Sequence, residues 1–298
     1  MPFAVLFVAL SFLSDPFLHT ENLLNILDQQ SSLLIIAAAG TLVLVAGGID
    51  LSVGATYSLA AVVAATAGQK HSTLYAVMAG LIVGLGVGLL NGVIITVLRI
   101  NSLIATLAMS FVIGGIGAKV TGGNLIVLTD RPGFGKIAQG VFLGTPSSVW
   151  LMLLVVLFLG ILLTRTVLGR HFFAAGGNAE AARLAGIRVN QVRIMTFVLS
   201  GGAAGLAGII DASRVLSAQS SQGSALAFTV LAGIVVGGTS IAGGDGSVVR
   251  TVIGVLFIAL IGNGFDLLGL DPLYQQITLG VILLIAVALD AWSRKQRR

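Results

Sequence analysis

Long apolar stretches separated by short polar segments dominate this chain. A helix needs about 20 apolar residues to cross a bilayer, and the apolar stretches predict ten membrane-spanning helices. They are predicted at residues 2–14, 31–48, 51–68, 73–98, 102–118, 148–164, 194–210, 225–242, 251–265 and 273–289. The first lacks the basic segment and cleavage site of a signal peptide, so we read it as a span. We therefore expect residues 1–298 to form one all-α, polytopic membrane domain.

Composition narrows the possible functions. Of 298 residues, 56% are hydrophobic and 9% are charged, whereas soluble domains carry about 25% charged residues. This excludes a soluble enzyme, a disordered tail and a free nucleic-acid binder. The absence of cysteine excludes disulfides and thiolate metal sites. The three histidines are scattered without accompanying carboxylates, so we expect no metal, no cofactor and no catalytic residues.

Basic residues predict the orientation, because cytoplasmic loops are enriched in Lys and Arg. Four predicted spans separate two basic clusters, which places both on the same side. Counting backward puts the N-terminus there as well, with residues 119–147 and 211–224 on the outer side. Three bases in the first outer segment count against this orientation, but the two clusters are larger. The clusters are Arg165, Arg170, Arg183, Arg188 and Arg193, and Arg294, Lys295, Arg297 and Arg298.

Glycine is the second signal along the chain. Gly80, Gly84, Gly88 and Gly92 recur every four residues, which favours close helix packing in lipid. Gly-Gly pairs also interrupt the apolar pattern near residues 44–52 and again near 235–247. Paired interruptions in two halves are typical of transporters built from repeats. We therefore expect two pseudo-symmetric halves.

Asp50 is the only charge between Asp28 and Lys70. A carboxylate inside a membrane is costly and is a candidate for function. Alternatively, Asp50 caps the following helix by accepting a hydrogen bond from the backbone near Ser52 or Val53.

Residues 176–187 predict a short helix within a basic loop at about 165–193. Asn178 is suited to cap this helix and Gly186 to end it. The helix is either a free surface helix or a plug for a groove on another subunit.

Three segments resemble the ribose-type permeases of bacterial ABC importers. Residues 47–54 (Gly-Gly-Ile-Asp-Leu-Ser-Val-Gly) resemble the signature of that family. The segment Glu180-Ala181-Ala182-x-x-x-Gly186 resembles the coupling loop of ABC permeases, and residues 237–248 resemble a later segment of the same family. These segments occur in the order of the family. Two features depart from it: no cytoplasmic tail precedes the first span, and Arg250 stands where a small residue is expected.

The resemblance implies a pseudo-symmetric permease of about ten spans in the bacterial inner membrane. It implies two cytoplasmic ATPase subunits, an extracytoplasmic binding protein and a second permease subunit, with a monosaccharide or related polar solute as cargo. The coupling residues it implies are Gly177, Asn178, Glu180, Ala181, Ala182 and Gly186. Polar residues in or beside the spans are candidates to line the path, or else make helix–helix contacts: Asp50, Ser52, Asn91, Ser110, Thr229 and Asn263.

Two other classes remain open. A secondary transporter or channel would need no ATPase and would show more buried ionisable groups than Asp50. A membrane-embedded enzyme is disfavoured, because no catalytic constellation is present. The near-absence of charge within the spans favours an uncharged polar solute over an ion.

Overall fold

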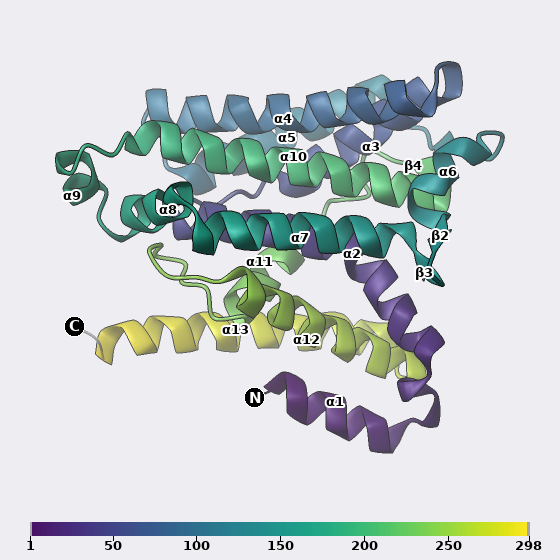
Figure 1. Ribbon diagram of the computed structural model, residues 1–298. Helices are drawn as coiled ribbons and strands as arrows, with labels where there is room; N and C mark the ends of the chain where they lie inside the picture. Colours follow the sequence, from purple (N-terminus) through teal and green to yellow (C-terminus); the bar gives the residue numbers. More distant parts are fainter. Residues whose placement is uncertain (1, 297–298) are drawn as a thin grey trace.

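The structure, a computed structural model, describes residues 2–296 and shows long helices lying side by side (Figure 1). Arg297 and Arg298 of the predicted C-terminal basic cluster lie outside the described residues, as do the side chains of Arg294 and Lys295. The long helices are α2 (Thr20–Val45), α3 (Val53–Lys70), α4 (Thr73–Val97), α5 (Ser102–Thr121), α7 (Ser147–Arg165), α10 (Val189–Val215), α12 (Val248–Leu267) and α13 (Pro272–Gln296). The shorter elements are α1 (Pro2–Leu13), η1 (Asp15–Leu18), α6 (Pro132–Gln139), α8 (Val167–Gly177), α9 (Ala179–Leu184) and α11 (Leu226–Val236).

Each of the ten predicted segments contains a helix, so the prediction of an all-α membrane fold is confirmed. Within the described residues, six helices are long and apolar enough to cross a membrane: α2, α4, α5, α7, α10 and α12. Helices α1 and α11 and residues 273–285 of α13 are apolar but shorter. The count of ten spans therefore stays a prediction.

Helix boundaries differ from the predicted ones at several places, of which three change the interpretation. Helix α2 begins at Thr20 and α10 extends to Val215, so Asp28 and Asp211 lie within helices. The predicted outer segment 211–224 is corrected accordingly. Hydropathy marks only the part of a helix that lies in hydrocarbon, and a helix can continue beyond it. In contrast, α11 ends at Val236, six residues earlier than predicted, because a glycine pair follows.

Glycine contacts hold the centre of the bundle together, as the four-residue spacing predicted. Helix α10 packs against α2, α3 and α4. A Cβ atom at Gly84 would lie 2.4 Å from the carbonyl oxygen of Gly201, and one at Gly88 would lie 2.3 Å from that of Phe197. Only glycine permits this approach of α4 to α10.

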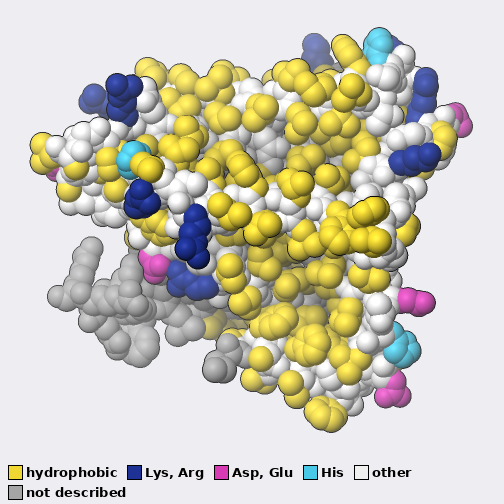
Figure 2. All heavy atoms as spheres, in the orientation of Figure 1, with side chains coloured by type: hydrophobic (Ala, Val, Ile, Leu, Met, Phe, Trp, Pro, Cys, Tyr) yellow, Lys and Arg dark blue, Asp and Glu magenta, His cyan; other side chains and the backbone are white. Residues whose placement is uncertain are grey.

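The two ends of the bundle differ. Helix α9 and the final turns of α13 lie at one end, while α6 and the short strands lie at the other (Figure 1). Strand β1 (Ile126–Val127) pairs with β4 (Ser217–Ala218), and β2 (Val141–Phe142) pairs with β3 (Thr145–Pro146). Figure 2 shows apolar side chains over the middle of the molecule and charged ones toward its two ends. This distribution fits a membrane-spanning protein.

Candidate functional site

A glycine pair ends α2, with Gly48 buried and Gly47 exposed. Gly47 has a φ of +78°, a left-handed conformation that glycine adopts without strain. Its N–H donates to the carbonyl of Leu44 and the N–H of Gly48 donates to that of Val43, both at 2.9 Å. This pattern is the Schellman motif. The chain then runs as non-helical backbone to Ser52, before α3 begins.

The second half of the chain ends α11 in the same way. Gly238 has a φ of +84°. Its N–H donates to Val235 at 2.8 Å, and the N–H of Thr239 donates to Ile234 at 3.2 Å. The same cap at corresponding places supports the expected pseudo-symmetry of the two halves.

The two breaks meet each other and the end of α8. The N–H of Gly244, in the loop after α11, donates to the carbonyl of Val45 at 2.9 Å. A Cβ atom at Gly176 would lie 1.8 Å from that same carbonyl oxygen and 2.8 Å from the Gly244 nitrogen. Gly176 lies three residues before α9, whose first residue is Ala179. We call this crossing of Val45, Gly176 and Gly244 the glycine junction.

The predicted short helix is confirmed as α9. The Asn178 side chain accepts hydrogen bonds from the N–H groups of Glu180 and Ala181 at 3.1 and 3.0 Å. Gly186, with a φ of +84°, ends the helix as expected. Ala182 is buried, whereas Glu180 is exposed. Figure 1 shows α9 projecting from the end of the bundle.

Asp50 lies in the segment between α2 and α3 and accepts hydrogen bonds from Ser52 of that segment and from Ser200 of α10. Its Oδ1 accepts from the N–H and Oγ of Ser52 at 3.0 and 2.6 Å. Its Oδ2 accepts from Ser200 Oγ of α10 at 2.8 Å. Asn91 of α4 donates to Ser52 Oγ at 2.7 Å. Asp50 therefore accepts from Ser52 as the capping alternative expected, although Ser52 itself holds the cap position.

Helix α5 satisfies the backbone of this non-helical segment. Ser102 Oγ accepts from the N–H of Ile49, and Thr106 Oγ1 accepts from the N–H of Leu51, both at 3.0 Å. Non-helical backbone at membrane depth requires such partners. The sequence analysis missed Ser102, Thr106 and Ser200, because each looks like an ordinary small residue of a span.

The segment from Gly47 to Gly54 borders two cavities. Its first two glycines line the α4–α10 cavity, of about 600 Å³, which lies at the turn between α4 and α5. Leu51 and Gly54 line the α3–α5 cavity, of about 460 Å³. The remaining walls of the α3–α5 cavity are mostly apolar and partly aromatic, with five serines among them. They include Ser58, Ser110, Phe111, Ser220, Ser221, Ser224 and Phe228.

The six predicted path residues fall in three places. Asp50, Ser52 and Asn91 share the network above, and Ser110 lines the α3–α5 cavity. Thr229 and Asn263 line a separate pocket of about 290 Å³ between α2, α11, α12 and α13. Asn263 there exchanges two hydrogen bonds with Asn22, at 2.8 and 3.2 Å. The structure does not bring these last two residues to Asp50.

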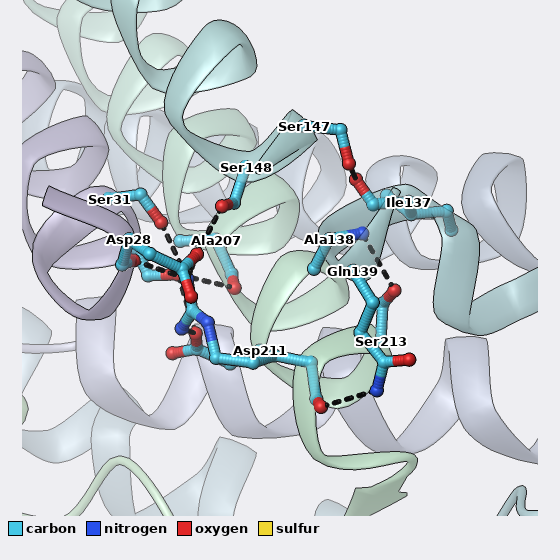
Figure 3. Close-up of polar contacts among 12 residues, drawn as sticks. Asp28, Ser31, Ile137, Ala138, Gln139, Ser147, Ser148, Ala207, Asp211 and Ser213 are labelled. Carbon is cyan, nitrogen blue, oxygen red and sulfur yellow. Dashed lines mark hydrogen bonds and ion pairs between the residues drawn. The ribbon is translucent and has the colours of Figure 1, made fainter. Parts of the chain in front are cut away.

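An ionic cluster at the other end of the bundle was not predicted. Arg214 Nη2 lies 3.2 Å from Asp28 Oδ1, and Nη1 bonds to Asp211. Tyr57 donates to Asp211 Oδ2 at 2.6 Å, and Ser148 of α7 donates to Asp28. Figure 3 shows side chains of different helices converging here. The cluster joins α2, α3, α7 and α10. The three-residue spacing of Asp211 and Arg214 is the one sequence feature that could have indicated an ion pair here.

Arg250 forms an exposed ion pair, with its Nη2 2.8 Å from Asp245 Oδ1. Its backbone carbonyl packs against Gly237, where a Cβ atom would lie 2.4 Å from the oxygen. The close approach at this contact is therefore provided by Gly237, while the Arg250 guanidinium pairs with Asp245.

Comparison with known proteins identifies the family. A family model described as the branched-chain amino acid transport system / permease component matches residues 22–287. The chain belongs to this permease family. The ribose import permease protein RbsC of Escherichia coli K12 is 41% identical to this chain, and the match covers 98% of this chain and 92% of RbsC. RbsC of Bacillus subtilis is 40% identical, over 96% of the permease and 89% of its own length.

An arabinose relative is similarly close. The L-arabinose ABC transporter permease protein AraH of Azospirillum brasilense is 36% identical over all of the permease and 88% of its own length. No solved structure matches the permease. The segments 47–54, 180–186 and 237–248, which carried the resemblance, lie at the glycine junction or within a few residues of it in the sequence.

Proposed function

We propose that this chain is the membrane-spanning subunit of a bacterial ABC importer for a monosaccharide or a related uncharged polar solute. Relatives that match nearly the whole chain are named as ribose and L-arabinose permeases. The α3–α5 cavity supports this solute class. Its serine hydroxyls can hydrogen-bond sugar hydroxyls, and Phe111 and Phe228 offer apolar surface to the ring face. None of the described residues that line it is ionisable.

The observation that carries the coupling mechanism is the glycine junction. A cytoplasmic ATPase subunit docks on α9, where Glu180 and Leu184 are exposed. Movement of α9 reaches Gly176 through Gly177 and Asn178. At Gly176 the backbone is in van der Waals contact with the break of each half, so one displacement acts on both.

The segment 47–54 then controls access. It stands between the α4–α10 cavity and the α3–α5 cavity, and α5 holds it through Ser102 and Thr106. Shifting the segment relative to α5 opens one cavity toward the other. Asp50 and Ser52 of this segment form a polar network with Asn91 of α4, and these residues contact the solute as it passes.

A second copy of the chain completes the path. Phe111 is 75% exposed and Phe228 is 55% exposed at the rim of the α3–α5 cavity, which leaves one side of that cavity open. A homodimer closes this side and gives the two α9 helices that two ATPase subunits require. Lipid covers the remaining apolar surface. The α9 end and both termini face the cytoplasm, and an extracytoplasmic binding protein docks on segments 119–147 and 216–224 at the opposite end.

A second candidate is a secondary transporter or channel that needs no ATPase. The ionic cluster favours it, because Asp28, Asp211 and Arg214 add ionisable groups within the bundle, with side chains 17–22% exposed. Uptake driven by an ion gradient, in vesicles containing this chain alone, would establish that alternative.

Docking on α9 is tested by reversing one charge. We expect Glu180→Lys to lower solute-stimulated ATP hydrolysis and co-purification of the ATPase subunits, while membrane insertion is unchanged. Asp130→Lys makes the same charge change on an exposed residue at the opposite end and should leave ATPase attachment intact. Normal hydrolysis and transport by Glu180→Lys would remove α9 from the coupling mechanism.

A further inference from the structure

The α4–α10 cavity is strongly basic. Three arginines line it from separate segments: Arg99 in the turn between α4 and α5, Arg183 in α9 and Arg193 in α10. No carboxylate is among its lining residues. Like charges held around one cavity repel each other, so a site of this kind favours an anion in the space between them.

Among the residues whose side chains the structure describes, no carboxylate pairs with these arginines. The ion pairs found there involve Arg214 and Arg250. The Nε atom of Arg193 is buried and has no hydrogen-bond partner among the described residues. A buried donor without a partner is rare in proteins and calls for a ligand or another explanation.

The backbone around the cavity is also unusual. Arg99 has a φ of +55°, a left-handed conformation that non-glycine residues seldom adopt. Strained positions of this kind concentrate at functional sites. Two residues after Arg99, Asn101 caps the start of α5, whose N-terminus borders the cavity. The positive end of a helix dipole adds to the attraction for an anion.

We propose that the α4–α10 cavity binds a phosphate group, carried either by a soluble phosphate monoester or by an anionic lipid headgroup. Guanidinium groups bind phosphate oxygens in pairs, and Ser102, Thr96 and Asn190 supply neutral polar groups in the same lining. The volume of about 600 Å³ is large enough for a phosphate together with the small organic group that it esterifies. Basic pockets between membrane helices bind lipid headgroups by the same chemistry.

A bound phosphate would connect the docking helix to the bundle. Arg183 belongs to α9, whereas Arg99 and Arg193 belong to the bundle. An anion held by all three arginines restrains α9 relative to the bundle. Binding of the anion therefore regulates how movement of α9 is transmitted to the bundle. The cytoplasmic position of this site rests on the proposed orientation of the chain, but phosphate binding itself does not.

The test measures anion binding by the full-length chain in two arms. In the first arm, the chain is placed in nanodiscs of phosphatidylcholine alone and titrated calorimetrically with glycerol 3-phosphate. In the second arm, retention of added phosphatidylglycerol is measured by native mass spectrometry. We expect Arg99→Gln/Arg193→Gln to weaken binding at least tenfold in one of the two arms. That arm identifies whether the phosphate comes from a soluble ester or a lipid.

A matched control is Arg170→Gln, which removes an exposed arginine of α8 that does not line the cavity. It should bind like the unmodified chain. If the double variant fails to fold, Arg99→Gln alone serves, because Arg99 is exposed in a turn. We expect Arg193→Lys to retain more binding than Arg193→Gln.

Two outcomes overturn the proposal. One is equal binding, or no binding, by the unmodified chain and the Gln variants in both arms. The other is loss of ATPase attachment by the variants with unchanged anion binding, which would mean that an acidic side chain of the ATPase fills the cavity. Both outcomes leave the proposed transport function untouched, since neither measures solute uptake.

Discussion

Gly176→Ala places a methyl group at the glycine junction. Its Cβ atom would lie 1.8 Å from the Val45 carbonyl oxygen, whereas an ordinary contact begins at 3.4 Å. The α8 backbone must therefore move about 1.6 Å away from α2 (3.4 minus 1.8), because the atom that it meets is backbone and cannot rotate aside. Overpacking of this kind costs about 1–3 kcal/mol of stability.

The displacement falls three residues before α9, so we expect its main effect on coupling. The variant and the unmodified chain are each reconstituted with ATPase subunits and binding protein, and solute imported per ATP hydrolysed is measured. A misplacement of about 1 Å can lower an enzyme rate about 100-fold. We expect Gly176→Ala to import at least tenfold less solute per ATP hydrolysed, with ATP hydrolysis retained.

Gly160→Ala in α7 is the matched control, because its Cβ atom would meet Val248 at 3.9 Å, an ordinary contact. It should import as much solute per ATP as the unmodified chain. If Gly176→Ala, with the complex assembled, also imports the unmodified amount per ATP, the reasoning about the junction is refuted.

Three further substitutions test other contacts. Asp50→Asn keeps the shape of the side chain but removes its charge. We expect roughly tenfold slower import with normal folding, since a hydrogen bond to a charged group contributes about 1.5–3 kcal/mol. Unchanged import would exclude a role for the charge. Thr106→Val leaves the Leu51 N–H unpaired and should lower the free energy of unfolding by about 1–3 kcal/mol. The control is Thr164→Val, at an exposed position of α7. Equal losses by the two variants in a denaturation series would mean that the Thr106–Leu51 hydrogen bond does not stabilise the fold. Arg214→Gln leaves the carboxylates of Asp28 and Asp211 without their partner. We expect the free energy of unfolding to fall by an amount near the lower end of the roughly 3–5 kcal/mol typical of a buried pair. Arg250→Gln breaks an exposed pair and should lower it by at most about 1 kcal/mol.

Much of this fold was predictable, because its signals are local. Apolar length predicted the helices, the four-residue glycine spacing predicted close packing of α4, and cap residues predicted α9. Asn178 and Gly186 identify that helix because capping involves only neighbours in sequence. The occurrence of one Gly-Gly break in each half was also predictable from the sequence, since each break needs a glycine at positive φ.

Contacts between distant segments were not predictable in this way. Nothing local places Gly176 on Val45, or joins Asp28 to Arg214 across 186 residues. Ser102, Thr106 and Ser200 gain their roles from the segment they face, which hydropathy does not reveal. For the same reason Thr229 and Asn263, chosen only as polar residues in apolar spans, lie in a different pocket from Asp50.

The central claim is that this chain imports a neutral sugar at the expense of ATP hydrolysed by partner subunits. The most direct measurement is uptake of radiolabelled monosaccharides into proteoliposomes, with and without the ATPase subunits, the binding protein and ATP. We expect uptake that requires all three and that is insensitive to a proton or sodium gradient. Gradient-driven uptake by the chain alone, without ATP, would contradict the account.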